Sequence, residues 1–454
     1  MKNISIWKDI KDKKYGVLNE DVETDVLIIG GGITGISTLY HLRDSKLNVM
    51  LVEQNKIGYS TTGNSTGKLS FLQNDLLDKI RNSFDEKSLG LYLNSQIDAI
   101  NMIKSIIDKE HIDCDLESSK SCIYTNKDSE IDKVKDLERV LNKYKIKTNV
   151  IIPNYVKSKY AIEVSGTYLI HPIKLLYGLL KNNDYPIYEN TSIKRIDKCD
   201  DGYLCHTDNH VIKAKKVVLA SHYPYFIKPY LFPIKGYLEK SYISASKSNI
   251  GRTSLISYSN PFISARSYKD YLIYLSNSHS IDSKVDDEKN FSELLKKVSD
   301  LNLKPDYLWS NIDIITNDGL PYIGLLKDNM YIGTGYNTWG LTNGFLAGNI
   351  IADLIHNKKN EFESLFDPYR LNMSQVTGAF KDGIKSVKGY ISGCVNSNVD
   401  GMINEHAVER ICPHLGCKLL YNSVEKTWDC PCHGSRFDLS GKVISGPANR
   451  DITL

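Results

Sequence analysis

The chain has 454 residues, of which 41% are hydrophobic and 24% are charged, so it is long enough for two or three domains with a sizeable core. A formal net charge of +3 gives no reason to expect nucleic acid or an anionic membrane as a partner. The sequence contains no apolar run of eighteen residues and no apolar leader after Met1, so neither a transmembrane segment nor a secretory signal is expected.

The first strong motif is a βαβ unit at residues 25–53. An apolar strand leads into the glycines Gly30, Gly32 and Gly35, a helix runs to about residue 44, and a second strand ends at Glu53. The GxGxxG spacing at this point predicts a dinucleotide site, with a tight turn, a close backbone approach to a pyrophosphate and a helix packed on its strand. Glu53 is placed to bind ribose hydroxyls and disfavours a 2′-phosphate. The predicted cofactor contacts in this unit are Gly30, Gly32, Ile33, Thr34, Gly35, Glu53 and Gln54.

Two further segments extend the predicted cofactor site. A small, hydroxyl-rich loop at residues 58–68 includes Thr61 and Thr62 and is suited to lie beside a pyrophosphate or an isoalloxazine ring. Near residue 330 a strand, a glycine-rich loop and a helix follow one another, which brings a second positive helix end into the structure. No second GxGxxG occurs, and this argues against reductases that bind FAD and NADH on separate domains.

The C-terminal region carries two short loops with the pattern C-x-H-(x15)-C-x-x-H. They supply Cys412 and His414 from one loop and Cys430 and His433 from the other. Two thiolates and two imidazoles suit a Rieske [2Fe–2S] centre, in which two Cys hold one iron and two His hold the other. A structural zinc ion is the alternative. A zinc finger usually takes its Cys pair and its His pair from different knuckles, whereas each loop here offers one of each.

The two loops resemble those of the Rieske family. The resemblance implies that Cys412, His414, Cys430 and His433 are the cluster ligands, and that a disulfide between the remaining loop cysteines clamps the loops together. High-potential members of that family have a Ser and a Tyr that donate hydrogen bonds to the sulfurs. This chain keeps Ser435 but has Phe437 at the Tyr position, which predicts a lower potential. The implied disulfide joins Cys417 and Cys432.

The fingerprint and the late glycine-rich loop resemble the D-amino-acid-oxidase-like flavoproteins, and more closely the bacterial members with a fused C-terminal Rieske domain. The resemblance implies FAD, with Ile193 beside the adenine, Ala220 at a strand end passing the flavin, and the late loop at the flavin pyrimidine edge. Asn64 stands where some relatives have a His that can attach flavin covalently, so we predict non-covalent FAD. The residues assigned to the late loop are Gly335, Gly340, Leu341 and Thr342.

The predicted fold is α/β, with a Rossmann-like FAD-binding domain, an α+β substrate domain and a small all-β Rieske domain. We expect an N-terminal extension at 1–20, an oxidoreductase domain at 21–365, a linker at 366–388 and the Rieske domain at 389–454. Within the oxidoreductase domain, the FAD-binding parts are predicted at 21–75, 150–236 and 305–365, and the substrate or cap parts at 76–149 and 237–304. The opening segment of the Rieske domain is short, which predicts a trimmed base or one that leans on the flavoprotein.

The implied function is an FAD-dependent oxidoreductase. A small organic substrate, such as an amine or amino acid, exchanges electrons with a one-electron donor or acceptor protein or a quinone-like carrier through the cluster. The alternative is a non-catalytic electron-transfer or redox-sensing protein. The five cysteines outside the cluster loops are most simply interpreted as free thiols, which indicates a reducing cytoplasm. The sequence identifies no general base, and the candidate pocket residues are Arg266, Lys68, His171 and Tyr237.

Overall fold

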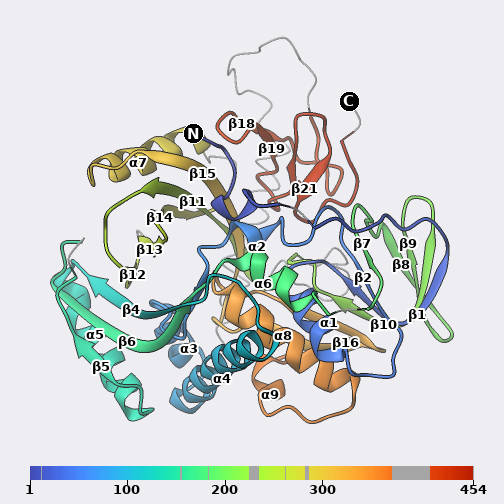
Figure 1. Ribbon diagram of the computed structural model, residues 1–454, viewed down its shortest axis with the longest axis horizontal. Coiled ribbons are helices and arrows are strands. Elements are labelled where there is room, and N and C mark those ends of the chain that lie inside the picture. Colours follow the sequence, from blue (N-terminus) through green and yellow to red (C-terminus); the bar gives the residue numbers. More distant parts are fainter. Residues whose placement is uncertain are drawn as a thin grey trace.

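The computed structural model describes residues 1–11, 13–153, 156–182, 184–223, 235–260, 262–281, 286–370 and 410–452. Three sheets organise this part of the chain, and Figure 1 shows the small C-terminal sheet, in red, beside the two larger ones.

The first large sheet is the Rossmann-like one. Its central strand β1 (Val22–Ile29) pairs in parallel with β2 (Val49–Val52) on one side and β10 (Val211–Leu219) on the other. Where these strands lie deepest, at residues 26–29, 49–52 and 217–219, they are buried apolar runs, and α1 (Ile33–Leu42) and α8 (Gly340–Ile355) help to bury them. The other strands of this sheet are β7 (Ile187–Tyr188), β8 (Arg195–Cys199), β9 (Gly202–His206), β16 (Tyr322–Lys327) and β17 (Met330–Thr334).

The second large sheet has nine strands in the order β15-β11-β14-β13-β12-β4-β6-β3, with β5 paired to β6. Its strands are β3 (Lys68–Leu69), β4 (Glu117–Thr125), β5 (Thr148–Val150), β6 (Tyr160–Leu169), β11 (Gly236–Lys247), β12 (Ser254–Ser257), β13 (Ser264–Tyr268), β14 (Tyr271–Ser280) and β15 (Pro305–Thr316).

This sheet includes strands from segments on both sides of the boundaries predicted from the sequence. Strands β6 and β15 fall in segments that the sequence assigned to the FAD-binding parts, but both belong to the nine-stranded sheet. The reason is pairing between distant segments, because β15 pairs with β11 along its whole length and β6 pairs with β4. Such pairing leaves no local mark in the sequence.

Helices cover the sheets and lie between them (Figure 1). The long helix α4 begins after the N-cap Asp85, whose carboxylate accepts a hydrogen bond from the Ser88 backbone, and it packs against α8. Besides α1 and α8, the helices of the described residues are η1 (Ile6–Lys8), α2 (Thr61–Asn64), α3 (Leu76–Ser83), α4 (Glu86–Glu110), α5 (Asp128–Lys143), α6 (Pro172–Leu179), α7 (Asp287–Ser299) and α9 (Glu363–Phe366).

The first residues of the chain pack on the oxidoreductase part. Trp7, in η1, is fully buried, and its indole N–H donates to the backbone carbonyl of Ser65 at 2.7 Å. Asn3 donates to the backbone of Val424 in the C-terminal domain at 2.5 Å. The N-terminal segment therefore contacts both parts of the protein.

The C-terminal sheet consists of β18 (Leu420–Asn422), β19 (Thr427–Asp429), β20 (Arg436–Phe437) and β21 (Val443–Ser445), all antiparallel. The expected opening segment of this domain and most of the predicted linker lie outside the described residues. Among the helices of the described ranges, none is both long enough and apolar enough to span a membrane.

The C-terminal domain is anchored on the oxidoreductase part through buried charges. Lys240 of β11 is 2% exposed, and its ammonium lies 2.7 Å from Asp429 and 2.8 Å from Asp287. Beside this pair, Arg436 binds Glu425 at 2.7 Å, and Glu425 also accepts a hydrogen bond from the Ser310 backbone at 3.0 Å. These contacts fix the small domain over the middle of the β11–β15 pair.

Candidate functional site

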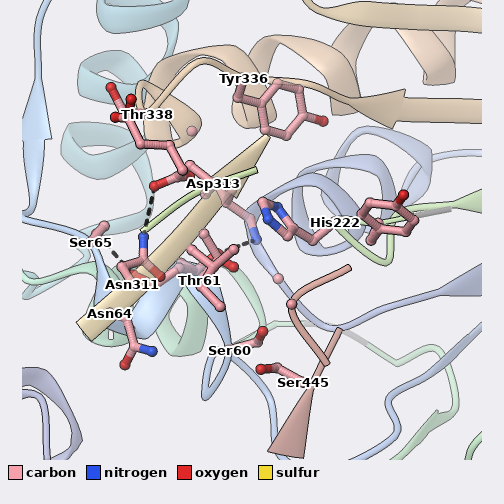
Figure 2. Close-up of a pocket in the computed structure, with 18 of the residues that line it drawn as sticks. Ser60, Thr61, Asn64, Ser65, His222, Asn311, Asp313, Tyr336, Thr338 and Ser445 are labelled. Atoms are coloured by element: carbon pink, nitrogen blue, oxygen red, sulfur yellow. Dashed lines mark hydrogen bonds between the residues drawn. The ribbon is translucent and has the colours of Figure 1, made fainter. Parts of the chain in front are cut away.

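A large cavity lies where the two large sheets and the C-terminal domain meet. Its volume is about 320 Å³. Its walls are the end of β1, the loop at 58–68, the residues after β10, the loop before α8 and the cavity side of β11 and β15. The C-terminal domain completes it with residues 433, 434, 436 and 444–446, and Figure 2 shows Ser445 in the same wall as Ser60 and Thr61.

The glycine fingerprint forms the floor of this cavity. Gly30 has a φ of +116°, and a Cβ there would lie 2.6 Å from the carbonyl oxygen of Ala220. A Cβ on Gly35 would overlap the carbonyl oxygen of Gly30, so only glycine allows α1 to lie this close to β1. Gly32 instead faces the cavity, at the N-terminal end of α1 where unpaired N–H groups favour a phosphate.

Glu53 lies at the end of β2, inside the cavity. Its carboxylate accepts hydrogen bonds from the backbone of Gly31 at 2.7 Å and of Asn55 at 2.8 Å. Burial raises the pKa of this carboxyl, and the backbone donors counteract the rise. The carboxylate is thus held beside the glycine turn.

The structure brings most of the predicted cofactor residues together. Gly35, Gly335 and Thr342 do not line the cavity: Gly35 serves helix packing, and the Thr342 hydroxyl donates to the backbone of Trp339 at 3.4 Å. The predicted residues that line the cavity are Gly30, Gly32, Ile33, Thr34, Glu53, Gln54, Thr61, Thr62, Ile193, Ala220, Gly340 and Leu341.

Three buried polar atoms in the cavity wall have no hydrogen-bond partner within the described part of the chain. They are Oδ1 of Asn64, Nε2 of His222 and Nε1 of Trp339. Buried polar groups are almost always paired in proteins, so unpaired ones facing a cavity indicate a missing ligand. A dinucleotide bound over the glycine turn would fit these groups.

Two of the four candidate pocket residues, Arg266 and His171, do not line the cavity. The guanidinium of Arg266 is fully buried and donates to the backbone carbonyls of Gly67 at 2.5 Å and Ile170 at 3.0 Å, so it is part of the scaffold. His171 caps α6 by accepting a hydrogen bond from the Lys174 backbone at 3.3 Å. In a sequence, Arg and His are both plausible substrate ligands. Here Arg266 binds backbone carbonyls and His171 caps a helix.

Lys68 and Tyr237 do line the cavity. The ammonium of Lys68 donates to the backbone of Leu255 and to the Ser264 hydroxyl, both at 2.8 Å. Burial, and then the nearby Arg266, lower the pKa of Lys68 to about 7.

Three carboxylates that the sequence analysis did not identify also line the cavity: Asp75, Glu239 and Asp313. Burial raises the pKa of Glu239 and of Asp313 to about 7 and that of Asp75 to about 6. For Glu239 and Asp313 the sequence signal is the alternation of side chains along β11 and β15, which becomes visible only once the pairing of these strands is known.

The two C-terminal loops assemble the predicted cluster ligands. Cys412 and Cys430 are buried, and their thiols interact with each other, which lowers the pKa of Cys412 to about 7 and raises that of Cys430. The rings of His414 and His433 lie 5.2 Å apart. Nδ1 of each His is buried without a hydrogen-bond partner in the described residues, which is expected of a nitrogen that binds metal.

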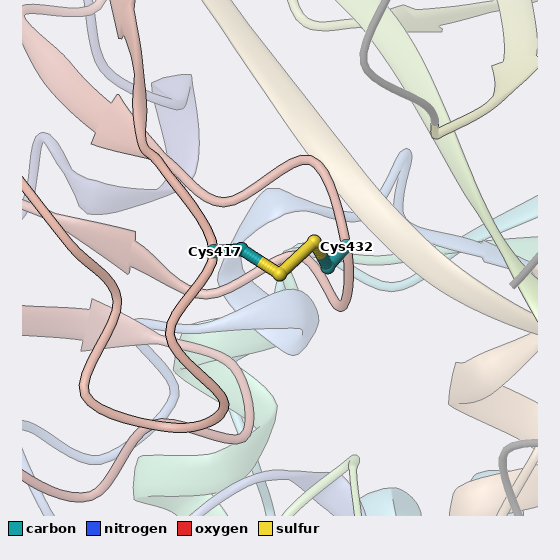
Figure 3. Close-up of a disulfide and its surroundings, with 2 residues drawn as sticks. All are labelled: Cys417 and Cys432. Carbon is teal, nitrogen blue, oxygen red and sulfur yellow. A yellow bond between two sulfur atoms is a disulfide. The ribbon is translucent and has the colours of Figure 1, made fainter. Parts of the chain in front are cut away.

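A disulfide joins Cys417 and Cys432, with an S–S distance of 2.02 Å, and ties the two loops together (Figure 3). The sulfur of Cys430 lies close to both disulfide sulfurs. Disulfide sulfurs cannot serve as thiolate ligands, so the free thiols that these two loops offer are those of Cys412 and Cys430.

One of the predicted cluster ligands faces the cavity. His433 lines the cavity wall, and the ring of Tyr223 lies 6.5 Å from its ring. The adjacent Gly434 packs against Leu238 and Ile312 of β11 and β15. The two predicted redox sites therefore share one enclosed space.

The sequence matches the FAD dependent oxidoreductase family over residues 25–354 and the Rieske [2Fe-2S] domain over residues 394–453. The chain belongs to the FAD-dependent oxidoreductase family and ends in a Rieske domain. Its cofactors are FAD and a [2Fe–2S] cluster, in agreement with the unpaired groups in both sites.

Similar proteins include Rieske 2Fe-2S iron-sulfur protein YhfW of Bacillus subtilis, which is 29% identical and aligns over 98% of this chain and 96% of its own length. Gamma-glutamylputrescine oxidoreductase of Escherichia coli is 24% identical over 77% of this chain and 88% of its own. Among solved structures, glycine oxidase from Geobacillus kaustophilus superimposes with a TM-score of 0.65 at 18% identity, covering 77% of this chain and 99% of that one. The last likeness concerns the fold.

Proposed function

We propose that the protein is a dehydrogenase of a small amine, and that it passes the electrons one at a time through its Rieske cluster to an external carrier. The observation that carries the proposal is the position of His433, a predicted cluster ligand, in the wall of the cavity that holds the FAD fingerprint. The name of the Escherichia coli relative, a gamma-glutamylputrescine oxidoreductase, supports an amine substrate.

The reaction removes a hydride from the carbon next to nitrogen, so that a C–H bond breaks, a C=N bond forms and water then releases the carbonyl product. FAD supplies a two-electron acceptor that can release electrons singly, and the cluster carries one electron at a time. Gly32 and Glu53 would hold the dinucleotide end of the cofactor, and β11 and β15 cover the site. Enclosure excludes water from the reacting carbon.

The route out of the cavity begins at His433. Tyr223 and His433 lie in ring contact, and both line the cavity. His414 belongs to the more exposed loop, next to Leu415, which is 48% exposed. We assign His433 as the ligand nearer the flavin and His414 as the ligand nearer the external one-electron partner. The same route operates in reverse if a donor reduces the cluster first.

Anaerobic mixing of the holoprotein with candidate amines tests the proposal. Flavin bleaching should appear first, followed by the signal of the reduced cluster in electron paramagnetic resonance. The control is the Cys430→Ser variant, in which flavin should bleach without a cluster signal. If no amine or amino acid bleaches the flavin, while an external donor reduces both centres, the protein is an electron-transfer or sensing protein and the proposal fails.

A further inference from the structure

Two carboxylates face each other in the cavity roof. Glu239 on β11 and Asp313 on β15 are register partners across an antiparallel strand pair, so their side chains project from the same face of the sheet. Both line the cavity, and they are 7% and 8% exposed. Like charges placed directly opposite each other weaken a sheet, and burial makes the pair more costly. An arrangement of this kind indicates a function for the pair.

Glu239 lacks a partner among the described residues, where its carboxylate makes neither a hydrogen bond nor an ion pair. Asp313 accepts a single side-chain hydrogen bond from the amide of Asn311, at 3.0 Å, as drawn in Figure 2. A buried, unpartnered carboxylate that faces a cavity needs a cation, because burying the charge alone is unfavourable.

The charges around Glu239 have an acidic balance. Its electrostatic neighbours are Asp313, Asp75 and the single ammonium of Lys79, which itself donates to the backbone of Thr316 at 2.7 Å. Three carboxylates thus face one ammonium. The other strong candidate for a carboxylate-binding cation, Arg266, is saturated by backbone carbonyls. This part of the cavity attracts cations and repels carboxylates.

An ammonium held between two carboxylates keeps its proton, because nearby negative charge stabilises the charged form. A protonated nitrogen has no lone pair to support loss of hydride from the adjacent carbon. The nitrogen that the carboxylates hold is therefore not the one that is oxidised. The substrate must therefore carry at least two nitrogens, one as the ammonium that the carboxylates bind and one next to the carbon that is oxidised.

We infer that the substrate is a diamine or polyamine, with one ammonium bound between Glu239 and Asp313 while the carbon beside a second nitrogen is oxidised. The inference rests on the proposed function for the fate of that second nitrogen. The step balances as for any amine: the second nitrogen loses a proton, its neighbouring carbon loses a hydride, and the two electrons leave singly to the external one-electron acceptor. The held ammonium does not change.

Binding can be measured apart from turnover. Calorimetric titrations of the holoprotein, with both redox centres reduced beforehand by dithionite, compare 1,4-diaminobutane, n-butylamine and 4-aminobutanoate, which differ only at one end of a four-carbon chain. The diamine should bind at least about tenfold more tightly than either of the others. Glu239→Gln and Asp313→Asn should each raise the Kd of the diamine about tenfold and leave that of n-butylamine within about twofold.

A matched control is Glu163→Gln, on β6 of the same sheet and outside the cavity, which should leave all three Kd values unchanged. Equal FAD content and cluster absorbance in the variants confirm that they fold. Equal affinity for diamine and n-butylamine, tighter binding of 4-aminobutanoate, or indifference to both cavity substitutions overturns the inference. If the diamine binds as expected but never bleaches the oxidised flavin, the binding site stands and the proposed function fails. If amines bleach the flavin while the variants bind normally, only the inference fails.

Discussion

Phe437 lies in β20, two residues after Ser435, and is fully buried in the core of the Rieske domain. At this position a tyrosine hydroxyl would add a donor toward the cluster sulfurs and stabilise the reduced form. We therefore predict that Phe437→Tyr raises the cluster potential by about 60 mV, the equivalent of a tenfold change for one electron, and that Ser435→Ala lowers it. Redox titration followed by electron paramagnetic resonance measures both. A potential that does not respond to either substitution contradicts this account of the tuning.

The acidic pair in the cavity also predicts a pH dependence of stability. Burial raises the pKa values of Glu239 and Asp313 from 4.5 and 3.8 to about 7, so the folded state holds protons that the unfolded state has released. The free energy of unfolding should then fall as the pH rises from about 4 to about 7. Glu239→Gln removes one of the two carboxyl groups that cause this decrease in stability. The substitution should therefore stabilise the ligand-free protein at pH 8 by on the order of 1 to 3 kcal/mol, with little effect near pH 4. Thermal unfolding at both pH values measures it, and a variant less stable than the wild type at pH 8 would show that the carboxylate is paired.

At the scale of elements, the strand β11 connects the cavity to the Rieske domain, since Glu239 and its neighbour Lys240 project to opposite faces. Lys240→Met leaves the carboxylates of Asp287 and Asp429 without this ammonium, and we predict a loss of about 3 to 5 kcal/mol in the free energy of unfolding. Chemical denaturation measures it. The control is Lys198→Met, whose exposed pair with Asp328 should contribute less than about 1 kcal/mol. Equal effects of the two substitutions would mean that the buried pair does not anchor the domain.

The same strand explains what the sequence could and could not predict. The fingerprint at Gly30 and the two Cys-His loops are local patterns, because turn geometry and metal ligation each demand certain residues within a few positions. The carboxylate of Asp313 is different, since its meaning depends on β15 lying beside β11, which are about 70 residues apart in the sequence. Arg266 shows the converse. From the sequence alone, a guanidinium in a strand is a candidate substrate ligand, and only the fold shows the backbone carbonyls that it binds.

At the scale of the whole molecule, the Rieske domain is held to the oxidoreductase part at both ends of the cavity. Lys240 binds Asp429 at one end, and at the other the Asn55 amide donates to the backbone of Ile444 at 3.0 Å. The side chain of Asn449 donates to the backbone of Lys194 at 2.9 Å, next to the predicted adenine contact Ile193. A domain anchored in this way does not need to swing between a donor and an acceptor position.

We therefore predict that electrons pass from flavin to cluster within one molecule and without a large domain movement. After rapid anaerobic reduction of the flavin, the rate of cluster reduction should stay constant over a tenfold range of protein concentration and should not fall as sucrose raises the viscosity. In Lys240→Met, one anchor is lost, the domain gains freedom to move, and the rate should become slower and sensitive to viscosity, whereas Lys198→Met should behave as the wild type. Stopped-flow absorbance resolves the flavin and cluster signals. A rate proportional to protein concentration would place the transfer between molecules, and a viscosity-dependent rate in the wild type would show that the domain moves during each electron transfer.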